Sequence, residues 1–310
     1  MQQTTSADLI ERLSPWQRFQ DRLDNERVLG YVLVAPALVL LAGLIAYPFV
    51  LAVYLSVTDR VIAQAASGNF VGLDNFARLL QNSIFQQTVI NTFNYTFVSV
   101  FFKLAFGLLM ALILNEAIPM RNLFRGALLL PWVVPTSLSA LGWLWMFDPT
   151  YSVVNWLLVN SGLAEKGPLW LGQPFWAMLS VQLVNIWRGI PFFGISLLAG
   201  LQTIPQELYE AAEVDGANAW QRFRAITWPL LVPVTTVVTL FSIIQTFADF
   251  QIVYVLTRGG PMNSTHLFAT LSHQVAIMGS KIGEGAAISL FMFPILVIVI
   301  VLQLRYIRND

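Results

Sequence analysis

The chain has 310 residues, of which 56% are hydrophobic and only 11% are charged. An average soluble domain carries about 25% charged residues, so lipid is the expected solvent for most of this surface. A formal net charge of zero gives no electrostatic reason to expect a nucleic-acid partner. The absence of cysteine excludes disulfides, iron–sulfur clusters and thiolate zinc sites, and the sequence gives no reason to pair its two imidazoles, His266 and His273, with a metal.

Apolar stretches long enough to cross a membrane follow one another along the chain. A membrane-spanning helix needs about 20 predominantly apolar residues. Stretches that qualify are residues 28–57, 89–114, 123–147, 175–201, 228–250 and 286–306, and prolines interrupt several of them. Such breaks are tolerated where neighbouring helices or a cavity satisfy the freed backbone groups. We therefore predict an all-α integral membrane protein with six transmembrane helices.

The distribution of basic residues predicts the orientation of these spans. If the amino terminus is inside, the inner segments hold ten Lys and Arg residues and the outer segments hold five. The two others, Lys103 and Arg188, fall within spans. Because cytoplasmic loops carry the excess of positive charge, we expect both termini to be cytoplasmic.

The amino-terminal segment, residues 1–27, lacks the apolar core and cleavage site of a signal peptide. Trp16, Phe19 and Leu23 recur at helical spacing among charged residues. This pattern is typical of an amphipathic helix lying on the inner membrane surface, and a solvated tail is the alternative.

The inner loop at about residues 202–229 differs from the other loops. Thr203 with Gln206 fits a capping box that would begin a short helix. Gly216 permits the positive φ of a helix C-cap, and a second short helix is expected over residues 217–226. Two short helices would then project from the membrane, either to dock another protein or to pack as a connector on their own bundle.

This loop also carries a resemblance. Glu210-Ala211-Ala212, Gly216, Ile226 and Trp228-Pro229 follow the spacing of the signature E-A-A, three residues, G, nine residues, I, one residue, L-P. Only Trp228 departs from it, where Leu is usual. The chain resembles the permeases of binding-protein-dependent ABC importers, in the carbohydrate-uptake branch and similar to its maltose-permease-like first subunit. Further similar stretches are residues 47–59, 70–80, 128–135, 186–205 and 254–265, so the resemblance covers nearly the whole chain.

The resemblance implies a type I ABC importer permease fold in the bacterial inner membrane. It implies a second homologous permease, a cytoplasmic ATPase dimer and a periplasmic solute-binding protein as partners. ATP and Mg²⁺ would be bound by the ATPase, because this chain has no G-x-x-x-x-G-K-[ST] phosphate loop; the chain itself would hold no cofactor and would not be an enzyme. The residues expected to couple the chain to the ATPase are Glu207, Tyr209, Glu210, Ala211, Ala212, Asp215, Gly216, Ala217 and Phe223.

Charged side chains inside the spans point to a solute pathway. Lys103, Arg188 and Asp249 lie within predicted spans, where ionised groups are costly and usually face a cavity or a partner. Asp249 also ends a polar stripe on one helical face, with apolar residues such as Phe241 and Ala248 at the other positions. The members of the stripe are Ser242, Gln245, Thr246 and Asp249.

The resemblance places sugar contacts in the same two regions. One is the W-x-G-x-P stretch, here residues 187–191, and the other is the polar stripe. The substrate-binding residues it implies are Arg188, Gly189, Phe192, Ser242, Gln245, Thr246 and Asp249. The charged Arg188 and Asp249 depart from the maltose pattern, so maltose itself is doubtful. The alternatives for Arg188 and Asp249 are a structural ion pair or contact with the companion permease. For Lys103 they are snorkelling, pairing with a neighbouring helix or contact with the companion permease.

The expected function is the transmembrane half-channel of an ATP-driven importer for a sugar or sugar-like solute. One alternative is the same machine with glycerol phosphate or another anionic or polyol cargo. Another is a stand-alone secondary transporter, which would show inverted repeats of interrupted spans. An intramembrane hydrolase would need a serine or metal constellation, and the lack of cysteine and the position of both histidines in an outer loop disfavour it. The long outer segments, residues 59–88 and 251–284, would meet a binding protein or cap the bundle.

Overall fold

The computed structural model describes residues 26–62, 64, 66–116 and 120–309. Over this part of the chain the fold is helical, and the only extended pairing is an isolated bridge between Thr58 and Phe70. The chain divides into two compact units, residues 1–54 and 55–310. The amphipathic helix predicted around Trp16, Phe19 and Leu23 lies outside the described residues.

The first unit consists of one long apolar helical run. Helix α3 (Glu26–Leu41) passes through a π-helical turn, η1 (Ala42–Ala46), into α4 (Tyr47–Ser56), whose last two residues belong to the second unit. Pro48 has no N–H for the helical ladder, which accounts for the local change of pattern. Residues Leu29–Ser56 have a mean hydropathy of 2.4, and their most apolar stretch contains no buried residue. A helix of this length and exposure suits lipid or another membrane protein as its surroundings.

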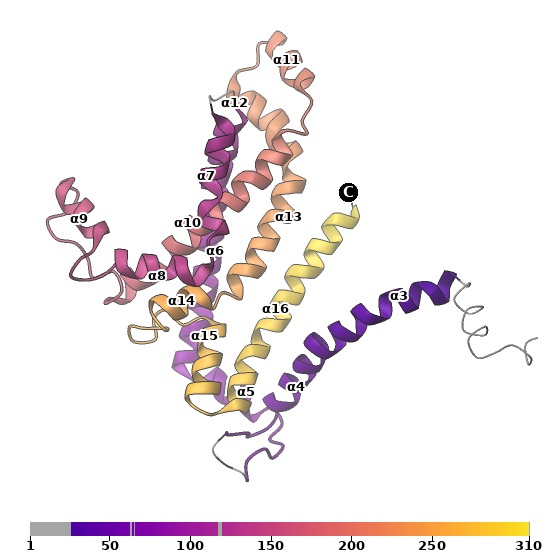
Figure 1. Cartoon of the computed structure of the whole chain (residues 1–310), viewed down its shortest axis with the longest axis vertical. Coiled ribbons are helices and arrows are strands. Elements are labelled where there is room, and N and C mark those ends of the chain that lie inside the picture. The colour runs from indigo at the N-terminus through magenta and orange to yellow at the C-terminus, as the bar shows by residue number, and fades with distance from the viewer. Residues whose placement is uncertain (1–25, 63, 65, 117–119, 310) are drawn as a thin grey trace, which may run out of the picture. The chain divides into compact units, whose positions relative to one another are not determined.

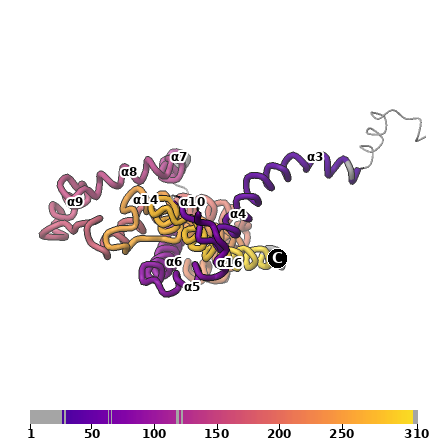
Figure 2. Tube along the Cα trace, turned by 90° about the horizontal axis from the view of Figure 1, so that it is seen from below, coloured from indigo at the N-terminus to yellow at the C-terminus, as the bar shows by residue number. Residues whose placement is uncertain are grey.

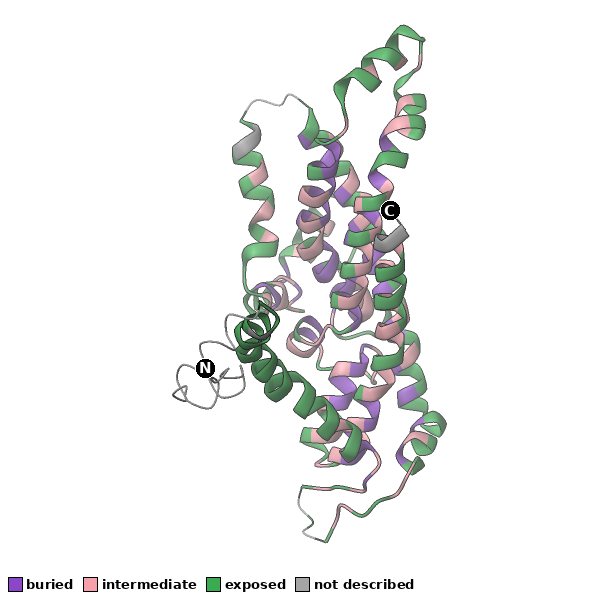
Figure 3. Cartoon of the chain, turned by 90° about the vertical axis from the view of Figure 1, so that its right-hand side faces the viewer, coloured by how far each residue is buried: buried purple, intermediate pink, exposed green. Residues whose placement is uncertain are grey.

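The second unit is a helical bundle (Figure 1). Its four long helices are α6 (Ser83–Asn115), α10 (Pro174–Leu201), α13 (Trp228–Phe247) and α16 (Ile282–Asn309). Helix α10 packs along α6, α13 packs against both, and α16 packs against α13. Close approach of α6 and α10 depends on Gly107, because a Cβ there would overlap Phe193. Figure 3 shows the buried positions on the inner faces of the bundle helices and exposed positions on their outer faces.

Three apolar clusters form the core of this unit. The first is centred on Ala111, Leu197 and Leu231, and the second on Tyr95, Val184 and Val253. The third joins α5 (Asp74–Gln81) to α15 (Phe268–His273) through Leu79, Phe268 and Leu271. On α10, Arg188 lies between Val184 of the second cluster and Leu197 of the first, so a charged residue separates two apolar layers.

The predicted span over residues 123–147 is broken. Two helices, α7 (Arg121–Val133) and α8 (Thr136–Met146), meet at 90° within this span, which the sequence predicts to be interrupted by prolines. Pro135 has no N–H and restricts Val134, which adopts the extended φ/ψ of −62°/134°. Five helical segments of the described chain are long and apolar enough to cross a membrane. The bent pair makes a sixth only if its two halves count as one span.

The remaining described elements are short. Helix α9 (Val153–Asn160) follows α8, and Figures 1 and 2 show both extending to the side of the bundle. The others are α11 (Gln206–Val214), α12 (Ala219–Arg222), η2 (Phe223–Thr227), α14 (Gln251–Leu256) and η3 (Gln274–Met278). In Figure 1, α11 lies at one end of the bundle, and α5 and α15 lie at the opposite end.

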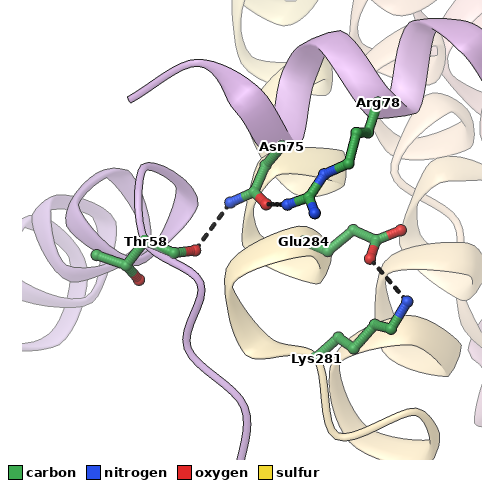
Figure 4. Close-up of polar contacts among 5 residues, drawn as sticks. All are labelled: Thr58, Asn75, Arg78, Lys281 and Glu284. Carbon is green, nitrogen blue, oxygen red and sulfur yellow. Dashed lines mark hydrogen bonds and ion pairs between the residues drawn. The ribbon is translucent and has the colours of Figure 1, made fainter. Parts of the chain in front are cut away.

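Polar contacts fasten the chain at the α5 end of the bundle (Figure 4). The buried amide of Asn75 donates to the backbone carbonyls of Ser56 and Thr58, at 2.7 and 2.8 Å. Arg78 donates to the Asn75 side-chain oxygen at 2.6 Å, which fixes the orientation of the amide. Lys281 and Glu284 form an ion pair of 3.2 Å at the start of α16. The segment after α4 is therefore held against α5 by specific hydrogen bonds.

The two histidines are packed rather than solvated. His266 is 2% exposed, and its ring lies against Gly259, whose φ is +90° and where a Cβ would overlap the imidazole. Burial lowers the pKa of His266 below its ordinary value of 6.5. His273 is the last residue of α15 and packs against the rings of Phe250 and Tyr254. Among the described residues, no group of three or more metal-binding side chains is present.

Candidate functional site

A cavity of about 610 Å³ lies among α6, α10, α13, α14 and the bend between α7 and α8. Its wall combines charged, amide, hydroxyl and aromatic groups. The charged members are Lys103, Arg188 and Asp249, and the aromatic members are Trp132, Phe192, Phe241 and Phe250. The neutral polar members are Thr136, Asn185, Ser242, Gln245, Thr246 and Gln251. Dense hydrogen-bonding groups beside aromatic faces form a surface that can bind a polar organic solute.

The structure brings all seven sequence-predicted substrate residues into this one wall. Arg188, Gly189 and Phe192 come from α10, and Ser242, Gln245 and Thr246 come from α13; Asp249 follows directly. Lys103 of α6 joins them. The segment lines the cavity with more than the predicted polar stripe, because the apolar Phe241 and Ala248, which were expected on the other face, also line it.

Asp249 is held by three hydrogen bonds from three different elements. The Tyr95 hydroxyl of α6 donates to Oδ2 at 2.7 Å, and the Asn185 amide of α10 donates to the same oxygen at 3.0 Å. The backbone N–H of Ile252 in α14 donates to Oδ1 at 3.3 Å. The carboxylate thus links α6, α10 and α14 where α13 ends, in addition to facing the cavity.

Lys103 is 5% exposed and donates a hydrogen bond from Nζ to Thr246 Oγ1 at 2.9 Å. Its methylene groups pack against Gly189, where a Cβ would collide with them. An ionised Lys at the centre of a membrane helix costs roughly 2.5–3.5 kcal/mol on insertion scales. The hydroxyl of Thr246 offsets part of this cost.

Arg188 has no such partner in the described part of the chain. Its Nε is buried and donates no hydrogen bond to another described residue, and no ion pair among the described residues includes its guanidinium. Neither Arg188 nor Lys103 has a nitrogen within 4.0 Å of an Asp249 oxygen. The alternative of a direct ion pair between Arg188 and Asp249 is therefore not what the structure shows.

Aromatic rings close one side of the cavity. Trp132 and Phe192 are stacked, with ring centroids 6.0 Å apart and an interplanar angle of 22°. Phe192 also packs against Phe241, with the two ring centroids 5.4 Å apart. Sequence reasoning missed Trp132, although it lies between Pro131 and Pro135 at a break in a membrane helix. Breaks in membrane helices are tolerated where the backbone lines a cavity or is buried in protein. The two prolines could therefore have indicated that Trp132 lies beside a cavity.

The coupling loop differs in detail from its prediction. The capping box of Thr203 and Gln206 is wrong, because the Thr203 hydroxyl donates to the Gly200 carbonyl at 2.8 Å and no side chain caps α11. The second helix begins at Ala219 rather than Ala217, after a capping box formed by Asn218 and Gln221. It then continues through η2 directly into α13 instead of ending. Pro229 has no N–H to donate to a residue of η2, which favours the π-helical pattern there.

Helix α11 carries most of the predicted coupling residues on an open surface. None of its residues is buried, and Gly216 has the predicted positive φ, +77°, just beyond its end. Two side-chain contacts tie α11 to the following span: the ion pair of Glu213 with Arg222, and a 2.9 Å hydrogen bond between the hydroxyls of Tyr209 and Thr227. These contacts join α11 to the start of the span that reaches the cavity.

Known proteins resemble the chain over most of its length. The family described as "Binding-protein-dependent transport system inner membrane component" matches residues 103–308. The sulfoquinovosyl glycerol transport system permease protein SmoG of Agrobacterium fabrum is 37% identical, over 100% of this chain and 99% of that protein. The trehalose/maltose transport system permease protein MalF of Thermococcus litoralis is 37% identical, over 91% of this chain and 94% of that protein.

Solved structures show the same fold. A chain of a bacterial ABC transporter that imports the acidic polysaccharide alginate has a TM-score of 0.75 and 24% identity, with coverage of 94% of this chain and 98% of that chain. The match to that transporter in complex with its periplasmic protein has a TM-score of 0.77, 23% identity and coverage of 93% and 96%. The resemblance based on the E-A-A segment is thus confirmed. The chain belongs to the family of binding-protein-dependent transport system inner membrane components.

Proposed function

We propose that this chain forms one half of the membrane pathway of an ATP-driven importer for a sugar or sugar-like solute. The observation that carries the proposal is the cavity, where amides, hydroxyls and charged groups converge beside stacked aromatic rings. Sugars offer dense hydroxyl groups and an apolar ring face, and such a wall complements both. Two relatives are named as permeases for carbohydrates, one for sulfoquinovosyl glycerol and one for trehalose and maltose. These names support a carbohydrate cargo.

Each group of substrate-binding residues has a role in this proposal. Gln245, Ser242 and Thr246 supply neutral donors and acceptors for hydroxyl groups. Phe192 supplies a ring face, Arg188 a cationic donor and Asp249 an acceptor. Gly189 admits the stem of Lys103 and lets the solute approach the backbone.

We propose further that α11 and the residues after it dock into a separate cytoplasmic ATPase dimer. ATP and Mg²⁺ bind to that partner, and this chain contributes coupling without a cofactor or catalysis of its own. The exposed face of α11 and its two contacts with α12 and η2 support this role, because they let a displacement of α11 move the span that follows. The proposed coupling residues are Glu207, Tyr209, Glu210, Ala211, Ala212, Asp215, Gly216, Ala217 and Phe223.

The proposed membrane arrangement has six spans and both termini in the cytoplasm of a bacterial cell. Residues 1–27 form a cytoplasmic amphipathic segment, and residues 28–310 form the permease domain with its coupling loop at about 202–229. A second homologous permease and lipid cover the exposed apolar helices, and a periplasmic solute-binding protein delivers the cargo. No nucleic acid takes part. The excess of basic residues in the inner loops supports this orientation.

A second candidate is the same machine with glycerol phosphate or another anionic or polyol cargo. The unpaired guanidinium of Arg188 favours it. A stand-alone secondary transporter has less support, because membership of this family and the exposed α11 both favour a partner-driven machine.

The proposal is tested by purifying the tagged chain from its native cell and identifying copurifying proteins by mass spectrometry. An ATPase, a second permease and a binding protein in stoichiometric amounts are expected. ATP-driven uptake of the solute eluted from that binding protein is then measured in proteoliposomes. Gln245→Ala should reduce uptake more than tenfold, whereas Gln173→Ala, which changes an exposed glutamine just before α10, should leave uptake unchanged. A chain that is recovered alone and transports without ATP contradicts the proposal.

A further inference from the structure

The charges in the cavity wall do not balance. Two cationic side chains, Lys103 and Arg188, face one carboxylate, Asp249, and no other acidic residue of the described chain lines the cavity. The Asp249 oxygens already accept three hydrogen bonds from neutral donors, and both cations lie beyond ion-pair distance of them. With Lys103, Arg188 and Asp249 all ionised, the wall carries one positive charge in excess, and its described residues form no direct ion pair.

The two cations also have unused hydrogen-bond donors. Arg188 has five N–H groups, none of which donates to another described residue, and its Nε is buried. Lys103 has three N–H groups, of which one is used by Thr246. The Lys103 stem packs against Gly189, the neighbour of Arg188, so both sets of donors lie in the same part of the wall.

A neutral solute would leave this charge uncompensated when the cavity closes around it. Enclosing a charge without a counter-charge is unfavourable, whereas a hydrogen-bonded pair of opposite charges is tolerated. An oxyanion with two or three acceptor atoms matches the planar fork of Arg188 and the ammonium of Lys103. The stacked rings of Trp132 and Phe192 remain available for the face of a sugar.

We infer that the cavity selects an anionic saccharide, that is, a sugar bearing one carboxylate, sulfonate or phosphate group. The acidic group binds Arg188 and Lys103, and the sugar ring lies on the wall formed by Trp132 and Phe192. Tyr95, Asn185 and Ile252 orient Asp249 by three hydrogen bonds, two to Oδ2 and one to Oδ1, so Oδ1 keeps an acceptor site for a sugar hydroxyl. This inference rests on the proposed carbohydrate function and narrows its cargo.

The test compares matched sugars on the assembled, purified transporter without its binding protein. The probes are glucose and its derivatives with a carboxylate, a sulfonate or a phosphate at carbon 6, and affinities are measured by ligand-observed NMR titration at low salt. At least one acidic derivative is expected to bind at least tenfold more tightly than glucose. The ranking of the three derivatives shows which acid is preferred.

Variants assign the preference to the cavity. Arg188→Gln should reduce the preference for the acidic sugar to less than threefold, and Arg188→Lys should retain most of it. Arg78→Gln is the matched control, because it removes the same charge from a residue that does not line the cavity. Arg78 lies in α5, where it contacts Asn75. Arg78→Gln should leave the preference unchanged.

The possible failures are distinguishable. Equal binding of glucose and all three acidic derivatives to the wild-type transporter overturns the inference but leaves the proposed carbohydrate function standing. A preference that survives Arg188→Gln, or is lost in Arg78→Gln, also overturns it. Binding of none of the four sugars contradicts both the inference and the assignment of this cavity to a carbohydrate.

Discussion

His266 illustrates how burial of a single side chain sets a pH dependence. Its imidazole is 2% exposed, and burial lowers its pKa below 6.5 in the folded protein. The unfolded chain therefore binds a proton more readily, so stability falls as the pH is lowered from about 6.5 towards the folded-state pKa. One proton limits this loss to about 1.4 kcal/mol per pH unit. We expect the melting temperature of the purified transporter to fall between pH 7.5 and 5.5.

Substitution separates this contribution from that of other groups. His266→Gln should flatten the pH dependence of the melting temperature, although it lowers the stability at pH 7.5 because the ring packs against Gly259. His273→Gln is the matched control, since His273 is only half-buried, between Phe250 and Tyr254. An unchanged slope in His266→Gln contradicts the assignment.

At the residue scale, the sequence was sufficient for groups that share one helix. The stripe from Ser242 to Asp249 follows from helical spacing, and the structure brings its members to one cavity wall. The partners of Asp249 could not be found in this way. Tyr95 and Asn185 lie 154 and 64 residues away in the chain, and neither shows a pattern that would pair it with a carboxylate.

At the element scale, the end of α11 depends on the backbone conformation of Gly216. Its φ is +77°, and a Cβ at this position would meet nothing within 4 Å, so a side chain there is opposed only by the backbone. A left-handed conformation costs a residue other than Gly roughly 1–2 kcal/mol. Gly216→Ala should therefore weaken the last turn of α11 and reduce uptake per ATP hydrolysed. Gly216→Asn should have a smaller effect, because Asn tolerates this conformation.

Hydrogen exchange of residues 206–216 measures the helix, and proteoliposome uptake measures the coupling. Gly162→Ala is the matched control, because Gly162 also has a positive φ, +72°, and open space around its Cβ position, but follows α9. Gly162→Ala should destabilise the end of α9 by a similar amount without changing uptake. Unchanged exchange of α11 in Gly216→Ala would show that this glycine does not determine the helix end.

The elements themselves were predictable to different degrees. Long apolar runs marked α6, α10, α13 and α16, because a run of that length permits little besides a membrane helix. The prolines of the third span predicted an interruption but not a bend of 90° between α7 and α8, since proline is also found inside intact helices such as α10. The start of α12 was misplaced for a local reason: Asn218 and Gln221 form a capping box that competes with helix formation at Ala217.

At the scale of the whole molecule, two long apolar stretches of the described residues have little or no buried surface. The most apolar stretch of α16 is only 17% buried, and that of Leu29–Ser56 is 0% buried. Lipid can cover such surfaces, and so can a second permease. The sequence indicated this from its composition, but one chain cannot show which helices face lipid and which face a partner.

The orientation of the bundle is the last prediction, and the chain is well suited to test it. It contains no cysteine, so a single introduced cysteine is the only thiol in the chain. Val214 and Met262 are suitable sites, because they are 89% and 88% exposed and lie on either side of the span Ala219–Leu256. If the coupling loop is cytoplasmic, a membrane-impermeant maleimide should label Met262→Cys in intact spheroplasts and Val214→Cys only after permeabilisation.

Labelling in detergent provides the control, because both cysteines should then react to a similar extent if no partner covers them. The opposite pattern in spheroplasts would place the carboxyl side of the span in the cytoplasm and reverse the proposed topology. Labelling of both sites in intact spheroplasts would mean that Ala219–Leu256 does not cross the membrane. Since this span joins α11 to the cavity wall, either result would also remove the proposed route from ATP hydrolysis to the solute.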